Sequence, residues 1–259
     1  MIAALQMYDF DWLRAATDRL WATIRDRLRA QGIEAPESLT RSGAQDDIWG
    51  DPGLLLSQTC GYPFWKTLRR KTEALATPIY GFSGCEGPNH CSFILAHRDD
   101  PRTELAQFRG DRAAVNGFAS NSGMNLFRAS IAPLAGGKPF FADIVETGAH
   151  VWSLAAIAEG RAELAAIDCV SYALLTHGAA QWIGATKIIA RTPSSPGLPF
   201  IASRLLPPAT RAAVRQALRA LPPFPELGFC GVAFLPETAY ARIEDIEREA
   251  AELGYPRLA

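Results

Sequence analysis

The sequence has little that would direct it to a nucleic acid or a membrane. Its 26 basic and 27 acidic residues leave a net charge of −1, so its charge indicates no polyanionic partner and we expect no nucleic acid. None of its apolar runs is long enough for a transmembrane helix. Residues Met1 to Tyr8 carry no basic segment and too short an apolar run for a signal peptide, and we interpret them as a first strand. Internal repeats and low-complexity tracts are also missing.

Recognisable enzyme and metal motifs are scarce as well. Gly81-Phe-Ser-Gly84 is one residue short of the nucleophile elbow Gly-x-Ser-x-Gly and precedes a predicted loop rather than a helix. Cys85, His90 and Cys91 lack the fourth ligand and the paired spacing that are typical of zinc sites. The sequence therefore predicts no catalytic residue, no metal and no cofactor.

The five cysteines form an odd set, which leaves at least one thiol unpaired and weakly favours a reducing compartment. Cys85 and Cys91 are close enough in sequence for a small-loop disulfide, and whether they are bridged stays open. Cys60 or Cys169 could act as a nucleophile with His150 as its base. A small buried residue is the commoner role for such a cysteine.

Apolar runs and helical stripes alternate along the chain. Strands are expected at residues 2–7, 54–57, 74–80, 91–97, 113–115, 140–145, 164–168 and 187–190. Helices are expected at residues 11–31, around 64–68, at 103–107, from about 121, and at 151–159, 169–175, 209–220 and 238–253. Pro78 is expected to bend the third strand or end its place in the sheet. The alternation predicts an α/β protein whose mostly parallel sheets are flanked by helices.

One stretch, residues 113–131, combines a strand end, a small polar turn and the start of a helix. Ser120, Asn121 and Ser122 stand where the helix should begin, and each is a good N-cap. The first helical turn has unpaired N–H groups and a partial positive charge, which suit a phosphate, phosphonate, sulfate or carboxylate. Taken alone, the same residues could simply cap the helix.

Other polar clusters follow predicted strands in the same way. They are Tyr8-Asp9, Ser57 to Tyr62, Asn116 to Ser122, Thr147 to His150, and Asp168. Ligands of open α/β sheets bind outside the carboxyl ends of the strands, so this recurrence predicts a binding site there.

Several of these clusters together resemble the phosphate/phosphite/phosphonate-binding family of ABC-transporter solute-binding proteins. The matching segments are Leu-Ser-Gln-Thr-Cys-Gly-Tyr62, Ser-Asn-Ser-Gly123, Thr-Gly-Ala-His150, Ala-Ala-Ile-Asp168 and Thr-Pro-Ser-Ser-Pro-Gly-Leu-Pro199. The resemblance implies a type II periplasmic-binding fold, in which two α/β lobes joined by a two-strand hinge clasp a small oxyanion. Residues 1–83 and 189–259 would form lobe one, and residues 84–188 would form lobe two.

The resemblance also implies a set of ligand-binding residues. The family's oxyanion site corresponds to Ser120, Asn121, Ser122, Gly123 and His150, with Asn121 standing where the family usually has threonine. The family's carboxylate falls on Asp168, which would suit the ammonium group of an aminophosphonate, although an aspartate there could also cap the next helix. From lobe one, the resemblance suggests Tyr8, Tyr62 and Tyr80.

Partners and compartment follow from the same resemblance. It implies a monomeric periplasmic receptor that serves an ABC permease if the protein is exported. Because no signal peptide is visible, a cytoplasmic sensor or a biosynthetic enzyme on the same fold stays open as an alternative.

Overall fold

The computed structural model describes the whole chain, Met1–Ala259, and its residues divide into two compact units. Unit 1 contains residues 1–81 and 196–239, and unit 2 contains residues 82–195 and 240–259. The last twenty residues, which the resemblance assigned to lobe one, belong to unit 2. The reason is packing: Asn125 donates to the carbonyl of Ile243 (3.0 Å), and Arg128 donates to that of Pro256 (2.7 Å).

Unit 1 is built on a five-stranded sheet in the order β1-β2-β12-β3-β13. Because β2 is parallel to β1 and β12 is antiparallel to both β2 and β3, strands β1, β2 and β3 point the same way. The strands are β1 (Ile2–Ala4), β2 (Leu54–Gln58), β3 (Thr72–Tyr80), β12 (Phe200–Ser203) and β13 (Phe229–Ala233). The helices are α1 (Arg14–Ala30), α2 (Gln45–Gly50), α3 (Gly61–Pro63), which continues as a π-turn over Phe64–Leu68, and α8 (Pro208–Arg219).

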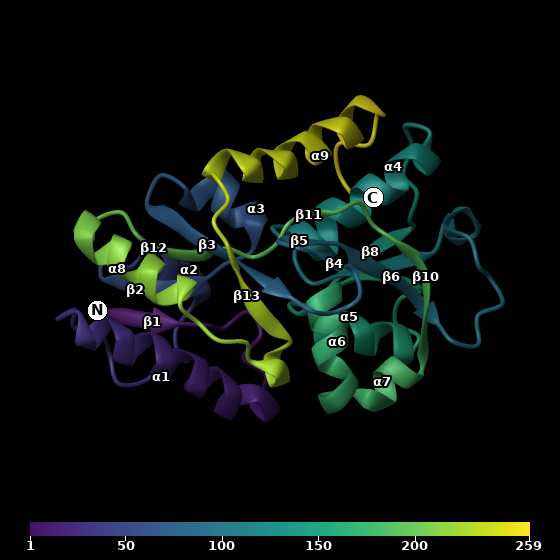
Figure 1. The fold of residues 1–259 in the computed structure, drawn as a ribbon. Coiled ribbons are helices and arrows are strands. Elements are labelled where there is room, and N and C mark those ends of the chain that lie inside the picture. Colours follow the sequence, from purple (N-terminus) through teal and green to yellow (C-terminus); the bar gives the residue numbers. More distant parts are fainter. The chain divides into compact units, whose positions relative to one another are not determined.

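Helix α1 is positioned by its apolar stripe, as the sequence predicts. Leu20, Ile24 and Leu28 recur at helical spacing and are buried. Helix α1 packs beside α8, which Figure 1 shows at the end of the unit where the N-terminus lies.

Strand β3 changes partner close to Pro78. Residues up to Ala76 pair with β12, whereas Thr77 to Tyr80 pair with β13. Proline has no N–H to donate, so it is tolerated where the ladder is being handed from one neighbour to another. The strand thus remains continuous through Pro78 and leaves its first partner there.

Unit 2 has a second five-stranded sheet in the order β10-β6-β9-β7-β8. Strands β7, β8 and β9 are parallel, β6 is antiparallel to β9, and β10 is antiparallel to β6. Four of its strands therefore point the same way. The strands are β6 (Ser92–His97), β7 (Arg112–Val115), β8 (Asp143–Glu146), β9 (Leu164–Asp168) and β10 (Thr186–Arg191).

Helices cover both faces of this second sheet. Figure 1 shows α5, α6 and α7 on one side of it and α4 and α9 on the other. Their bounds are α4 (Leu126–Ala135), α5 (His150–Ala158), α6 (Cys169–Gly178), α7 (Ala180–Gly184) and α9 (Ala241–Glu252). The α/β architecture expected from the sequence is confirmed. The sheets are mixed rather than mostly parallel, because β12, β13 and β6 run antiparallel to their neighbours.

Some elements differ from the expectation. The segment 81–89, expected as loop, contains β4 (Cys85–Glu86), which pairs with β5 (Asn89–His90) in a hairpin. Gly87, with a φ of +58°, opens its two-residue turn, a backbone angle that favours glycine. Strand β8 begins only at Asp143, because the N–H groups of Phe140 and Phe141 donate instead to the C-terminal residue Ala259. None of the helices combines the length and apolar character needed to cross a membrane.

Candidate anion-binding site

Four polar segments meet at one edge of the unit 2 sheet. Strands β7, β8 and β9 end there, and they are followed by Asn116, by Thr147 and by helix α6. Strand β6 runs the opposite way, with Ser92 paired to Asp168, so its beginning lies at the same edge. The candidate site is therefore assembled from residues that are far apart in the sequence.

The helix after β7 begins with a capped turn. The Ser120 side chain accepts a hydrogen bond from the N–H of Gly123 (3.0 Å), as expected of an N-cap. The first turn is a π-turn over Asn121–Asn125 (η4), in which the N–H of Asn125 donates to the carbonyl of Ser120, and it continues into α4. No helical turn precedes Asn121 and Ser122, so their N–H groups have no intrahelical acceptor. Such an end attracts an anion.

Gly123 is packed against the side chains of Asn116 and His150. A Cβ atom at this position would lie 1.8 Å from Oδ1 of Asn116 and 3.1 Å from Cε1 of His150. Oδ1 of Asn116 is itself buried without a hydrogen-bond partner. Any side chain larger than hydrogen would displace the groups that surround this turn, so the site requires glycine here.

His150 joins α5 to the start of the η4–α4 helix. It is the first residue of α5, and its Nε2 lies 2.9 Å from the hydroxyl oxygen of Ser122. Burial lowers the pKa of His150 below its usual range, although the nearby carboxylate of Asp168 acts in the opposite direction. The imidazole is therefore neutral at pH 7, with one nitrogen that donates and one that accepts.

Asp168 combines the two roles that the sequence left open. One oxygen, Oδ2, accepts from the N–H of Ser171 (2.8 Å) and so caps α6. The other, Oδ1, lies 3.8 Å from Nδ1 of His90, and both side chains are at most 5% exposed. Burial lowers the pKa of His90, against the attraction of Asp168. A neutral imidazole and a carboxylate therefore stand side by side behind the helix start.

Asn121 has a different environment from its serine neighbours. Its amide nitrogen donates to the hydroxyl of Ser195 (2.8 Å), and its amide oxygen accepts from the side chain of Asn125 (3.1 Å). Arg128 extends this buried network by donating to Asn125 (2.6 Å). The hydroxyl of Ser92 donates to the carbonyl of Ser122 (2.9 Å), which ties the turn to the sheet. The network fixes the position of the turn.

The three predicted tyrosines lie in unit 1. Tyr8 and Tyr80 meet edge to face, with ring centroids 5.5 Å apart. The amide of Gln58 donates to the hydroxyl of Tyr80 (3.4 Å), so the strand ends of β2 and β3 share this cluster. Tyr62 lies on α3, where Lys66 stands 5.7 Å from its ring centroid. The structure thus brings two of the three tyrosines into direct contact.

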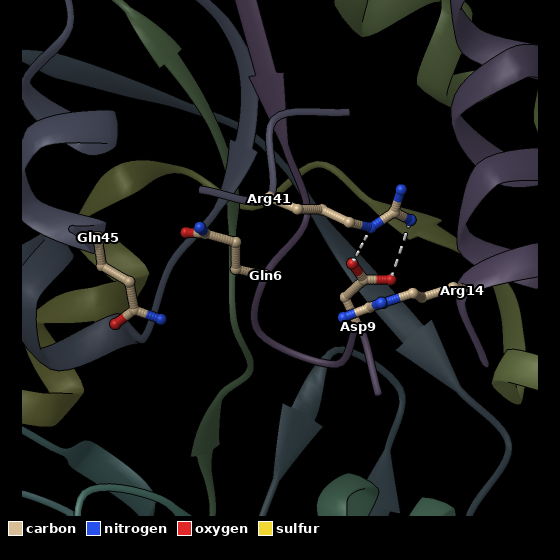
Figure 2. Close-up of a pocket in the computed structure, with 5 residues that line it drawn as sticks. All are labelled: Gln6, Asp9, Arg14, Arg41 and Gln45. Atoms are coloured by element: carbon tan, nitrogen blue, oxygen red, sulfur yellow. Dashed lines mark hydrogen bonds and ion pairs between the residues drawn. The ribbon is translucent and has the colours of Figure 1, made fainter. Parts of the chain in front are cut away.

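Unit 1 also has a polar pocket of about 220 Å³ just beyond β1 (Figure 2). Figure 2 shows the guanidinium of Arg41 facing the carboxylate of Asp9, and Nε and Oδ2 are 2.6 Å apart. The hydrogen bond to Asp9 raises the pKa of Arg41. Arg41 also pairs with Asp18 (2.8 Å), so the pocket's charges largely neutralise one another. The lining residues are Gln6, Asp9, Arg14, Arg41 and Gln45.

Two residues of the candidate site were missed by reasoning from the sequence. Asn116 was recognised only as part of a polar turn, and His90 only as a doubtful metal ligand. The direction of β6 could not be seen in the sequence, and it is this direction that places His90 at the carboxyl edge. No group of histidine, cysteine and acidic residues in the structure is arranged to hold a metal ion.

Comparison with known families decides the assignment. The model of a family described as "ABC transporter, phosphonate, periplasmic substrate-binding protein" matches residues 56–226. The chain belongs to this family. The resemblance seen in the sequence is therefore confirmed, and the alternative of a cytoplasmic sensor is not favoured. Among curated proteins, none matches the chain.

Solved structures show the same fold at low sequence identity. A binding protein component of an ABC phosphonate transporter from Pseudomonas aeruginosa has a TM-score of 0.75 at 14% identity, covering 98% of this chain and 87% of its own. PhnD1 from Prochlorococcus marinus in complex with methylphosphonate has a TM-score of 0.73 at 11% identity, covering 97% and 98%. XAC2383 from Xanthomonas citri bound to ATP has a TM-score of 0.68 at 16% identity, covering 98% and 97%. The type II periplasmic-binding fold of this receptor is confirmed.

Proposed function

We propose that this receptor binds a small phosphorus oxyanion, of the phosphonate, phosphate or phosphite class, at the start of the η4–α4 helix. The observation that carries the proposal is the contact of 2.9 Å between Ser122 and His150, next to a glycine that admits no side chain. The hydroxyls of Ser120 and Ser122 and the N–H groups of Asn121 and Ser122 would surround the anion, and Gly123 would leave room for it. Asn121 would act through its backbone, because its side chain already has partners.

The site would stabilise the anion with dipoles rather than with a full positive charge. Helix N–H groups and a neutral imidazole donate hydrogen bonds to an oxyanion and avoid the desolvation of a buried cation. Hydrogen bonds to charged groups are each worth about 1.5–3 kcal/mol, so several of them provide substantial affinity. This arrangement favours reversible capture and release.

Asp168 would select for a positive group on the ligand. Its carboxylate is nearly fully buried and faces His90 across 3.8 Å. A ligand ammonium close to Oδ1 would form a charge-assisted hydrogen bond, whereas a simple alkyl group would gain nothing there. We therefore expect aminoalkylphosphonates to bind more tightly than alkylphosphonates of the same length. Tyr8, Tyr62 and Tyr80 are proposed as further ligand contacts from unit 1.

The cellular role follows from the family. We propose that the receptor works as a monomer in the periplasm and delivers its ligand to an ABC permease. No chemical step is included, so the bound ligand should be recovered unchanged after long incubation. Phosphorus NMR of the recovered ligand tests this point, and a new product would favour the enzyme alternative.

A thermal-shift screen followed by calorimetry tests the proposed ligand class. The probes are methylphosphonate, 2-aminoethylphosphonate, phosphate, phosphite, sulfate and acetate. A ligand at a hundred times its Kd adds about 2.7 kcal/mol of stability, or roughly 5–10 °C in Tm for a chain of this size. We expect such a shift with a phosphorus oxyanion and none with acetate.

Matched serine variants then test the location. Ser122→Ala should weaken binding by about 1–3 kcal/mol, the cost of losing a hydrogen bond to a charged group. Ser130→Ala is the control, because the Ser130 hydroxyl only donates to the carbonyl of Leu126 one turn back in α4. Equal affinity of Ser122→Ala and the parent protein would contradict the assigned site, and an absence of shift with every phosphorus probe would contradict the ligand class.

A further inference from the structure

Three cysteines that the proposed function does not use lie together in unit 2. The sulfur of Cys85 is 3.5 Å from the sulfur of Cys169, and Cys169 is also hydrogen-bonded to Cys91. Cys169 and Cys91 are buried, at 0% and 6% exposed, whereas Cys85 is half-buried. Solvent therefore reaches the thiol of Cys85 but not that of Cys169.

The packing around these three thiols is tight enough to fix their positions relative to one another. Gly84, with a φ of +91°, carries the β4–β5 hairpin against them, and a Cβ atom there would lie 2.7 Å from Cβ of Cys169 and 3.0 Å from the sulfur of Cys91. The N–H of Cys91 donates to the carbonyl of Gly84 (3.1 Å), and the N–H of Cys169 to that of Cys91 (3.1 Å). These backbone bonds limit how far the sulfurs can separate.

The surroundings shift the pKa values of Cys91 and Cys169 in opposite directions. The hydrogen bond from Cys169, aided by the positive charge of Arg191, lowers the pKa of Cys91 despite its burial. The pKa of Cys169 is raised by its bonds to Cys85 and Cys91 and by burial. Cys169 is therefore held as a thiol, and the half-buried Cys85 is the sulfur that a small oxidant reaches first.

We propose that Cys85 and Cys169 form a disulfide. A low-molecular-weight disulfide first exchanges with the accessible Cys85, which forms a mixed disulfide and releases one thiol. Cys169 then attacks the Cys85 sulfur. The S–S bond to the small molecule breaks, and the small molecule leaves as its second thiol, having taken up the proton of Cys169. The two cysteines lose two electrons in total, which the added disulfide takes up.

This disulfide would tie together two elements of the anion site. Cys85 is paired with His90 across the β4–β5 hairpin, and Cys169 follows Asp168 at the start of α6. A link between them would hold the His90–Asp168 pair at its distance of 3.8 Å. Periplasmic proteins, the class to which this family belongs, fold where disulfides persist.

The test is oxidation of the full chain with oxidised glutathione, followed by alkylation and peptide mapping under non-reducing conditions. We expect the peptides of Cys85 and Cys169 to be linked, the loss of a pair of free thiols, and a Tm roughly 5–10 °C above that of the reduced protein. The mapping needs no ligand, so its result is independent of the proposed function. A link from Cys91 to either neighbour, a mixed disulfide that persists on Cys85, or no loss of thiols would overturn the proposal.

Three variants separate the roles. Cys85→Ser should abolish the link, whereas Cys230→Ser, which removes an exposed cysteine of unit 1, should leave it unchanged. Cys91→Ser should keep the link, because Cys91 is not one of its two sulfurs. Loss of the Cys85–Cys169 link in Cys91→Ser would overturn the pairing.

Discussion

The two units present different chemistry at the carboxyl edges of their sheets. In unit 2 the edge carries a helix start, two neutral histidines and one buried carboxylate, Asp168. In unit 1 the corresponding edge carries the Tyr8–Tyr80 ring pair and a pocket in which Arg41 is neutralised by Asp9 and Asp18. The same architecture thus carries hydrogen-bonding dipoles in unit 2, and aromatic rings and ion pairs that are already formed in unit 1.

This difference suggests which edge recognises charge. An ion pair that is already formed has little left to offer a ligand, because the ligand must compete with the partner carboxylate. The N–H groups of Asn121 and Ser122, at the start of the helix, have no intrahelical acceptor and no paired carboxylate to compete with the ligand. We therefore expect substitutions in unit 2 to change anion affinity, and substitutions of the paired charges in unit 1 to change mainly stability.

The largest effect is expected at Gly123. The added methyl group of Gly123→Ala would overlap Oδ1 of Asn116 and crowd His150. The Asn116 amide must then rotate away, and the groups proposed to bind the anion are displaced. We expect methylphosphonate affinity to fall by at least about 100-fold while circular dichroism stays unchanged, since a side-chain end can move without unfolding. Gly117→Ala is the control, because its nearest neighbour, Oε1 of Glu146, would be at an ordinary 3.6 Å.

A selective effect is expected at Asp168. Asn can still cap α6, so Asp168→Asn removes the charge and keeps the helix start. Calorimetry should show about tenfold weaker binding of 2-aminoethylphosphonate and little change for ethylphosphonate, since only the first has an ammonium. An equal loss for both ligands would contradict the role proposed for this carboxylate.

A smaller effect is expected from pH. His90 and His150 have lowered pKa values in the folded protein, so the unfolded chain binds more protons once the pH falls below about 6.5. Their stabilising contribution is complete above that pH and is lost on acidification. Between pH 7.5 and 5.5, we expect the free energy of unfolding in urea to fall by about 1 kcal/mol for each histidine.

Variants of the histidines check this assignment. His150→Asn should show a smaller fall in the free energy of unfolding over the same pH interval. His177→Asn, at an exposed position near the end of α6, should behave like the parent protein. A fall of the same size in all three proteins would place the titrating group elsewhere.

The smallest effect on binding is expected in unit 1. Arg41→Gln removes the partner of Asp9 and Asp18 and should cost about 1 kcal/mol of stability, as partly exposed ion pairs do. Methylphosphonate affinity should stay within about twofold of the parent value. A loss of affinity comparable to that of Ser122→Ala would mean that both edges recognise charge, and the comparison made above would fail.

The sequence by itself determined the elements and the family. The periodic stripe of α1, the apolar runs of β2 and β9 and the Ser-Asn-Ser-Gly123 turn are local patterns, because a helix or strand buries residues at a fixed spacing. The cap at Ser120 was also predictable, since an N-cap acts within three residues of itself. The short hairpin at Cys85 was not predicted. The start of β8 at Asp143 was not predicted either, because the C-terminal residue Ala259, distant in the chain, binds the N–H groups of Phe140 and Phe141.

Only the tertiary structure decided which side chains meet. The antiparallel direction of β6 brings His90 to Asp168 and the hairpin at Cys85 to Cys169, and it results from pairing with β9 at residues far along the chain. The packing of Asn116 and His150 around Gly123 likewise depends on two different connections at one sheet edge, the one after β7 and the one after β8. Such contacts are set by the order and direction of strands, which local residue patterns do not specify.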